Sequence, residues 1–195
     1  DPEALHNLEN AGTVRLMALM NTPLFDTIRS IDVEELLEHP TVIELDAISS
    51  RSQKALVAGM LLSQMMLVLR QRGDSQGTLR NIILIDEAHL LLGEEQPVDV
   101  RSGSAAPENA AVEVLQEMTR ILRSYGTGLL FGDQSPASLT RTILGNVNLK
   151  VMFRLDSVSD RSVLAETSNL SHRMTEDMVT LPAGTAYFYC DVLPQ

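Results

Sequence analysis

Two kinds of hydrophobic pattern alternate along the chain. Short, continuous apolar runs rich in β-branched residues indicate buried strands, and apolar positions recurring every three or four residues indicate helices. The first kind predicts strands at 41–46, 81–85, 126–134, 149–155 and 185–192. The second kind predicts helices at 1–21, 49–72, 108–125, 137–144, 160–167 and 172–179. Strands joined by connections of helix length are typical of a doubly wound α/β fold with a parallel sheet.

The pattern also divides the chain. Residues 1–40 form a helical lead-in, in which Ser30 or Asp32 can cap a short helix that ends before His39-Pro40. The main α/β unit then runs over 41–195. Within it, residues 93–110 are rich in Pro, Gly, Ser and Ala and lack apolar periodicity, which predicts a mobile surface loop.

The strand at 81–85 ends in two adjacent carboxylates. Ile82 to Ile85 run directly into Asp86 and Glu87. The carboxyl ends of parallel strands are where α/β proteins place their ligand sites. This arrangement is that of a Walker B motif, in which the first acid holds Mg²⁺ through its water shell and the second orients the attacking water. The alternative interpretation is a strand that ends in an acidic turn.

Composition narrows the function classes. Hydrophobic residues make up 44% of the 195 residues, which excludes general disorder, and the net charge of −11 argues against a free-standing nucleic-acid binder with a basic face. A motor that touches DNA through a few loops is not excluded, and Arg101 in loop 93–110 is one candidate contact, although an ordinary insertion is the competing interpretation. The single cysteine excludes an intramolecular disulfide and fits a cytoplasmic protein. The apolar stretch 55–69 is too short to span a bilayer and predicts a buried helix.

Several segments in order resemble the HerA/FtsK superfamily of ring-shaped P-loop ATPases. They are TVIELD at 41–46, IDEAH at 85–89, RSYGTGLLFGDQSP at 123–136, NVNLKVMFRLDSVSDRSVL at 146–164 and LPAG at 181–184. Together the likeness covers about residues 30–192. The resemblance implies a RecA-like α/β fold, a mostly parallel sheet flanked by helices, and use of ATP with Mg²⁺.

The resemblance implies a role for each matching residue. Asp86 becomes the metal-associated acid, Glu87 the catalytic glutamate and Gln134 the sensor of the γ-phosphate, so that these three side chains bind the cofactor. Arg123 matches an arginine that reaches the nucleotide of a neighbouring subunit, with Arg120 as the rival one turn earlier. The competing interpretations are a local turn residue for Gln134 and a solvated helix-end cation for Arg123.

His89 completes the letters DEAH, which also suggest a superfamily 2 helicase. That class needs a Ser-Ala-Thr-type motif next, whereas this chain has Asp133-Gln134-Ser135. His89 is therefore interpreted as a structural residue. Arg154, Asp160 and Arg161 suggest either a subunit contact or an exposed ion pair, and the ion pair is the preferred interpretation.

One element of the family is missing from the 195 residues. No G-x-x-x-x-G-K-[ST] loop, which cradles the phosphates, occurs in them. Either that loop and its strand lie upstream of Asp1, or the chain is a non-hydrolysing relative; the non-methionine start favours the first. We therefore expect the C-terminal part of a RecA-like ATPase domain, with a gap in its sheet where the P-loop strand belongs.

The resulting functional hypothesis is that the chain is part of an ATP-driven hexameric ring that translocates or unwinds duplex DNA. Such families serve DNA processing, DNA transfer or phage defence, including phosphorothioate-dependent restriction, and work with accessory nuclease or defence partners. Two alternatives stay open: a non-catalytic α/β interaction module, and a secretion-type ATPase that does not act on DNA.

Overall fold

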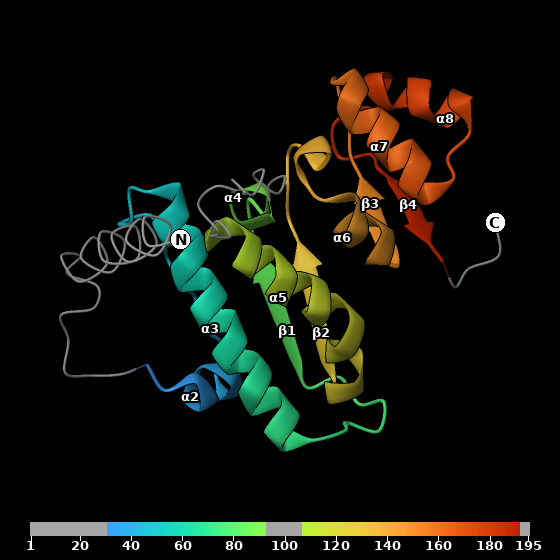
Figure 1. Ribbon diagram of the computed structural model, residues 1–195. Coiled ribbons are helices and arrows are strands. Elements are labelled where there is room, and N and C mark those ends of the chain that lie inside the picture. The colour runs from blue at the N-terminus through green and yellow to red at the C-terminus, as the bar shows by residue number, and fades with distance from the viewer. Residues whose placement is uncertain (1–30, 93–106, 192–195) are drawn as a thin grey trace, which may run out of the picture.

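The computed structural model describes residues 31–92 and 107–191 of the chain. Its helices and strands form two small sheets with helices packed against them (Figure 1). The predicted helix 1–21 lies outside the described residues, as do Arg101 and the part of the predicted loop that covers 93–106. The predicted α/β fold class with a parallel sheet flanked by helices is confirmed.

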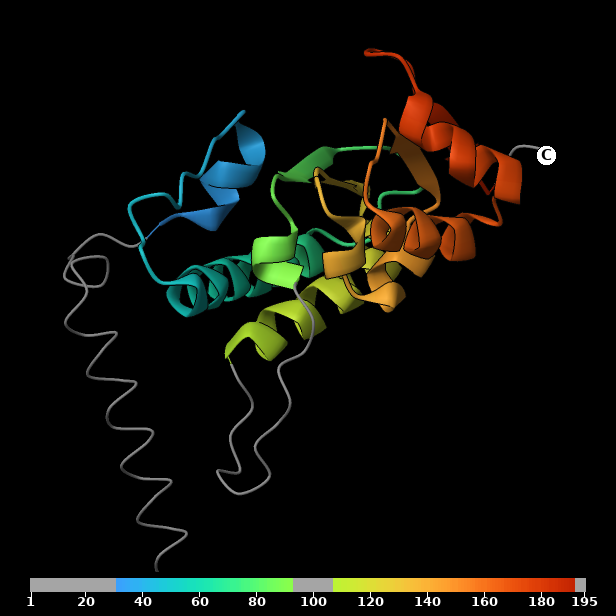
Figure 2. The ribbon, with the colours of Figure 1, turned by 90° about the horizontal axis from the view of Figure 1, so that it is seen from above.

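The first sheet pairs β1 (Asn81–Ile85) in parallel with β2 (Thr127–Phe131). The register sets Ile85 opposite Phe131, so both strands end at the same edge. Helix α5 (Pro107–Ile121) and the 3₁₀ turn η2 (Leu122–Tyr125) connect the strands, as expected for a parallel crossover. Seen from above, α3 (Arg51–Arg72) and α5 lie on one side of this sheet (Figure 2).

Local caps explain where the first helices begin and end. Asp32, one of the two predicted caps, accepts hydrogen bonds from the amides of Glu34 and Glu35 at the start of α2 (Val33–Glu38). The hydroxyl of Ser50 caps α3 in the same way. Helix α3 ends at Gly73, whose φ of 73° suits glycine better than any residue with a side chain.

The second sheet pairs β3 (Leu149–Met152) with β4 (Tyr187–Cys190) in antiparallel fashion. This antiparallel pair departs from the parallel pairing that is typical of strands joined by helices. Two helices, α7 (Val158–Ser168) and α8 (His172–Asp177), separate the strands, so the chain reverses direction once more than in a single-helix crossover. The remaining elements are α4 (His89–Leu92), η3 (Pro136–Ser138), α6 (Arg141–Asn146) and η4 (Met178–Thr180).

The predicted strand at 41–46 is also wrong. Residues 41–45 have no regular secondary structure, residue 46 lies in a turn, and none of them forms a ladder with the described strands. Val42 is 85% exposed and Ile43 41% exposed. An apolar segment becomes a strand only when a neighbouring strand satisfies its backbone groups, and here none does.

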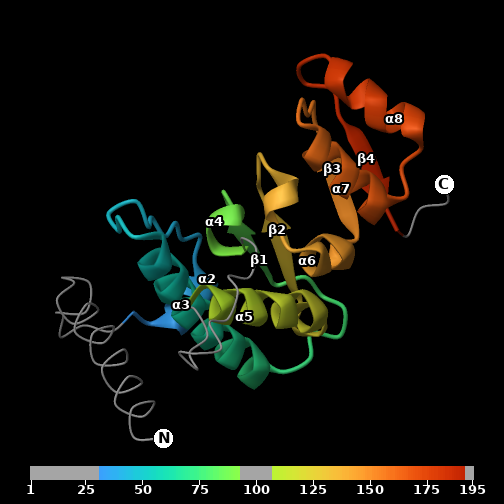
Figure 3. The same cartoon turned by 45° about the horizontal axis from the view of Figure 1, so that its top comes forward.

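The two sheets are separate, because β2 and β3 are not hydrogen-bonded to each other. Figure 3 shows β3, β4, α7 and α8 at one end of the molecule, with α6 between them and the first sheet. The break lies between the strand that precedes Gln134 and the last two strands, which is where the family resemblance places the P-loop strand. The predicted gap is therefore present.

Each sheet leaves one apolar face uncovered by the described residues. On the first sheet, Ile82 and Leu84 are 64% and 62% exposed. On the second, Val151 and Phe188 lie opposite each other and are 50% and 58% exposed. Contiguous apolar surface of this kind is typical of contact sites.

Helix α3 differs in part from its expected position between two layers. Leu62, Met66 and Leu69 are buried, while Met60 and Leu67 are 48% and 59% exposed. It is the one described helix that is long and apolar enough to cross a membrane by length and composition. Helix α3 packs against α5 and α2, so its apolar composition is that of a core helix.

The main core lies between α3, α5 and the first sheet. Leu115 and Met118 of α5 are fully buried there, and Leu69 of α3 is 1% exposed. Ile143 and Met178 continue the same core toward the second sheet.

We predict that Met118→Ala lowers the free energy of unfolding by about 2–5 kcal/mol, because the lost side chain leaves a cavity in packed surroundings. Met60→Ala is the matched control, since that methionine of α3 is 48% exposed. Urea unfolding with an unchanged m-value measures both. Equal effects at the two positions would contradict the described core.

The second sheet contains a buried lysine. Lys150 is 7% exposed, and its Nζ donates to the carbonyl oxygens of Val147 at 3.0 Å and Thr167 at 3.1 Å. The Tyr189 ring lies 4.7 Å from the same atom. Burial lowers the pKa of the Lys150 ammonium group, and the nearby Asp191 carboxylate opposes this only in part.

This lowered pKa predicts a pH dependence of stability. The unfolded chain keeps the Lys150 proton up to about pH 10.4, whereas the folded chain releases it at a lower pH. Between the folded and the unfolded pKa of Lys150, the unfolded chain therefore binds more protons, and the free energy of unfolding rises with pH. Wild type should gain stability relative to Lys150→Met between neutral and alkaline pH in urea unfolding. A pH-independent difference between the two proteins would refute this.

Candidate active site

The parallel pairing of β1 and β2 brings the predicted site residues together. Asp86 and Glu87 follow β1, and Asp133 and Gln134 follow β2 at the same edge of the sheet. The Nε2 of Gln134 donates a hydrogen bond to Oε1 of Glu87 at 2.7 Å. Glu87 is 37% exposed, so the pair is open to solvent rather than enclosed in a salt-bridged interior.

The turn after β1 is strained at Glu87. Its φ of 47° lies in the left-handed region, which costs a residue with a side chain about 1–3 kcal/mol. Two neighbouring bonds hold the turn: Oδ1 of Asp86 accepts the Glu87 amide at 3.0 Å, and the Gly132 carbonyl accepts the Ala88 amide at 3.1 Å. The conformation turns the Glu87 side chain toward Gln134.

Asp133 joins the two loops. Its side chain is 5% exposed. Oδ2 accepts the backbone N–H of His89 at 2.6 Å and lies 3.1 Å from the His89 Nδ1, while Oδ1 accepts the backbone N–H of Ser135 at 2.7 Å. The Nδ1 of His89 is also 3.4 Å from Oε2 of Glu87. From the other side, the Arg51 guanidinium at the start of α3 donates to the His89 carbonyl at 2.8 Å.

The surroundings of Asp86 suit an acid that binds a magnesium ion. It is exposed, and apart from the bond to the Glu87 amide its carboxylate accepts no hydrogen bond from the described residues. Mg²⁺ keeps most of its waters and binds through one or two carboxylates together with phosphate oxygens. Gly132 lies close to this carboxylate, because a Cβ at position 132 would come within 2.9 Å of Asp86 Oδ1.

Glu87, His89 and Asp133 also place possible ligand atoms within 4.8 Å of one another. Hydrogen bonds account for this cluster, since both oxygens of Asp133 already accept backbone amides and the His89 ring faces both carboxylates.

The loop that follows Gln134 is held by α7. Asp160 is 6% exposed, and its Oδ1 accepts the Ala137 amide at 2.8 Å and lies 3.3 Å from the Ser135 hydroxyl. The expectation of an exposed ion pair is therefore wrong for Asp160. Arg161 instead donates to the carbonyls of Leu155 and Asp156.

Arg123 and Arg120 lie away from this site. Arg123 belongs to η2, which precedes β2, so it sits at the opposite end of the strand from Gln134. Arg120 donates to the Gln116 carbonyl at 3.4 Å, and both arginines are exposed. Neither joins Glu87 within one chain, and action on a neighbouring subunit's nucleotide stays a prediction.

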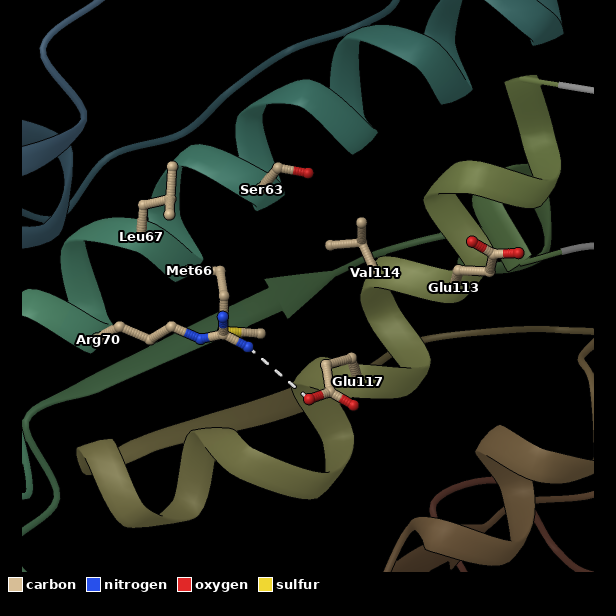
Figure 4. Close-up of a pocket in the computed structure, with 7 residues that line it drawn as sticks. All are labelled: Ser63, Met66, Leu67, Arg70, Glu113, Val114 and Glu117. Atoms are coloured by element: carbon tan, nitrogen blue, oxygen red, sulfur yellow. Dashed lines mark ion pairs between the residues drawn. The ribbon is translucent and has the colours of Figure 1, made fainter.

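A surface groove of about 380 Å³ lies elsewhere, between α3 and α5 (Figure 4). It is mainly apolar, and the Arg70–Glu117 ion pair at 3.7 Å spans it. Its lining residues are Ser63, Met66, Leu67, Arg70, Glu113, Val114 and Glu117. The predicted site residues are absent from that set, so the groove and the candidate active site are different places.

Sequence reasoning missed the contribution of Asp133. It lies directly before the predicted sensor and could have been read as a simple turn residue. The available signal was the position itself: an acid at the carboxyl end of the strand beside a histidine-containing turn can accept that turn's free amides. The corresponding signal for Asp160 was its place in the sequence. It is the third residue of a helix that Ser157 caps, and its own amide donates to the Ser157 hydroxyl.

Comparison with solved structures shows the class of fold. The genome packaging NTPase B204 from Sulfolobus turreted icosahedral virus 2, solved in complex with AMPPCP, matches with a TM-score of 0.51 and 16% sequence identity, over 85% of this chain and 73% of that chain. The chain thus has the fold of a P-loop NTPase.

Comparison of the sequence with those of known proteins finds relatives among DNA helicases. The DNA double-strand break repair helicase HerA of Sulfolobus acidocaldarius is 23% identical over 98% of this chain, and that of Pyrococcus furiosus is 26% identical over 54%. The resemblance to HerA/FtsK-type P-loop ATPases is confirmed. The matches span 36% and 17% of those two relatives. No family model matches the chain.

We predict that Glu87→Gly is more stable than Glu87→Ala by about 1 kcal/mol, since both delete the carboxylate but only glycine adopts the left-handed conformation without a Cβ penalty. Urea unfolding of the two variants gives the difference directly. An alanine variant at least as stable as the glycine variant would show that the turn is not left-handed at this position.

Proposed function

We propose that this chain is part of an ATP-driven DNA translocase or helicase of the HerA/FtsK type. The observation that carries the proposal is the 2.7 Å hydrogen bond between Gln134 and Glu87 at the shared end of two parallel strands. Sequence similarity to HerA helicases and the fold shared with a packaging NTPase support it.

The phosphate-binding element comes from polypeptide outside these 195 residues. The two sheets are not hydrogen-bonded to each other, so a strand inserted between β2 and β3 would pair with both. The exposed apolar residues of the sheets are suited to contact the helices that accompany such a strand. A phosphate loop at the end of such a strand would open at the edge that carries Asp86, Glu87 and Gln134.

The side chains divide the work of hydrolysis. Asp86 would hold Mg²⁺, and the ion when bound would neutralise charge on the phosphates. The Glu87 carboxylate accepts a hydrogen bond from the attacking water and aligns it. Gln134, which donates to Glu87 in this structure, has an amide able to turn its N–H groups toward a γ-phosphate oxygen instead. Arg123 serves the nucleotide of the next subunit in a hexameric ring, with Arg120 as the alternative.

Duplex DNA is the proposed polymer, and DNA processing, DNA transfer or phage defence the proposed setting. Stimulation of ATP hydrolysis by duplex DNA in the full-length protein tests this part. Hydrolysis that responds to no DNA would favour the secretion-type ATPase, and a full-length protein with no hydrolysis would favour the non-catalytic module.

We predict that Glu87→Gln lowers the ATP turnover of the full-length protein by about 100-fold or more while leaving nucleotide binding intact, because the amide keeps the shape but cannot act as a base. Glu176→Gln is the control, since that side chain on α8 is 72% exposed and far from the site. Turnover and binding of a non-hydrolysable ATP analogue are measured in parallel. Retained turnover in Glu87→Gln would remove Glu87 from its role.

A further inference from the structure

A buried carboxylate, that of Asp133, bonds to the loop that carries Glu87 and to the residue that follows Gln134. Asp133 is 5% exposed, and each of its oxygens has a defined partner: Oδ2 accepts the His89 amide at 2.6 Å and Oδ1 accepts the Ser135 amide at 2.7 Å. Burying a charge is unfavourable unless hydrogen bonds compensate. Here the compensation comes from both loops of the site at once.

On the β1 side, Asp133 holds the strained turn. Glu87 has a φ of 47°, and the next two amides of the turn are both tied to the β2 loop: Ala88 to the Gly132 carbonyl and His89 to the Asp133 carboxylate. A left-handed residue with a side chain persists only where its surroundings over-determine it. Among these restraints, the bond from Asp133 is the one that a side-chain substitution can remove.

The His89 ring extends the restraint to the Glu87 side chain. An ionised carboxylate only accepts hydrogen bonds, so the 3.1 Å contact to Asp133 Oδ2 is a hydrogen bond in the His89 tautomer that carries its proton on Nδ1. The same N–H lies 3.4 Å from Oε2 of Glu87, while Oε1 accepts from Gln134. Glu87 thus has one oxygen facing each loop.

On the β2 side, Asp133 fixes the residue that follows Gln134. The bond from the Ser135 amide closes a tight turn around Gln134 and presents its side chain toward Glu87. One carboxylate therefore sets the position of both Glu87 and Gln134.

We propose that Asp133 is a positioning residue for nucleotide hydrolysis, acting through His89 to aim Glu87 and through the Ser135 amide to aim Gln134. This inference rests on the proposed function. It makes a separate prediction, because removing the restraint should impair the chemical step while leaving the nucleotide contacts in place.

The kinetic test uses Asp133→Asn in the full-length ATPase. Asparagine has one acceptor oxygen, so it can serve His89 or Ser135 but not both. A displacement of about 1 Å at a reacting group can lower a rate about 100-fold, so we expect kcat to fall between about 10-fold and 100-fold with little change in KM for ATP. Asp177→Asn, an exposed acid of α8 with an i,i+4 ion pair to Arg173, is the matched control.

A second pair of variants keeps the test valid if Asp133→Asn fails to fold. His89→Asn places an amide N–H near the position of Nδ1, whereas His89→Ala removes it. The asparagine variant should keep most of the wild-type kcat, and the alanine variant should lose it to the same extent as Asp133→Asn. Equal activities of the two histidine variants would overturn the role of the ring.

A spectroscopic readout is independent of hydrolysis. The ¹⁵N chemical shifts of the His89 ring in this chain, assigned by comparison with His89→Asn, should report a proton on Nδ1. A neutral ring protonated on Nε2 alone would overturn the inference. Glu87→Gln run in parallel separates the two claims: if it loses turnover while the Asp133 and His89 variants keep wild-type kcat, the inference fails and the proposed function stands. If Glu87→Gln keeps turnover, the proposed function itself fails.

Discussion

The parallel pairing of β1 with β2 is the interaction on which the candidate site depends. Five residue pairs set the register, and this register ends both strands at one edge. Asp86 and Glu87 then meet Asp133 and Gln134, although more than 40 residues separate them along the chain. The crossover helix α5 makes the pairing possible, and its buried face of Leu115 and Met118 holds it against α3.

The site also contains two features that oppose folding. Glu87 adopts a left-handed conformation, and Asp133 is a buried carboxylate. Each is compensated by hydrogen bonds between the same two loops, and these hydrogen bonds hold the strained turn and the buried charge in a single arrangement. Unfavourable local features that are restrained in this way are typical of functional sites.

The sequence predicted those parts of the fold whose signals are local. The helix around 51–72, the strand at 81–85 and the Asp32 cap all depend on spacing and side-chain chemistry within a few residues. The segment 41–46 and the direction of β4 could not be predicted as reliably, because both depend on which strand lies alongside. In the site, the convergence of Glu87 and Gln134 followed from the resemblance, whereas the anchoring by Asp133 needed the three-dimensional distance to His89.

The exposed apolar faces of the two sheets bear on the proposed function. Both the β1–β2 sheet and the β3–β4 sheet carry exposed apolar residues. A further strand and its helix would cover this surface and bring phosphate-binding amides to the edge occupied by Glu87. The same insertion would join the two sheets into one.

The most direct test of this account is a structure of the full-length protein with Mg²⁺ and a non-hydrolysable ATP analogue. The account predicts a strand between β2 and β3, with the γ-phosphate of the analogue next to Glu87 and Gln134. A nucleotide bound elsewhere, or a break that stays empty in the full-length protein, would contradict it.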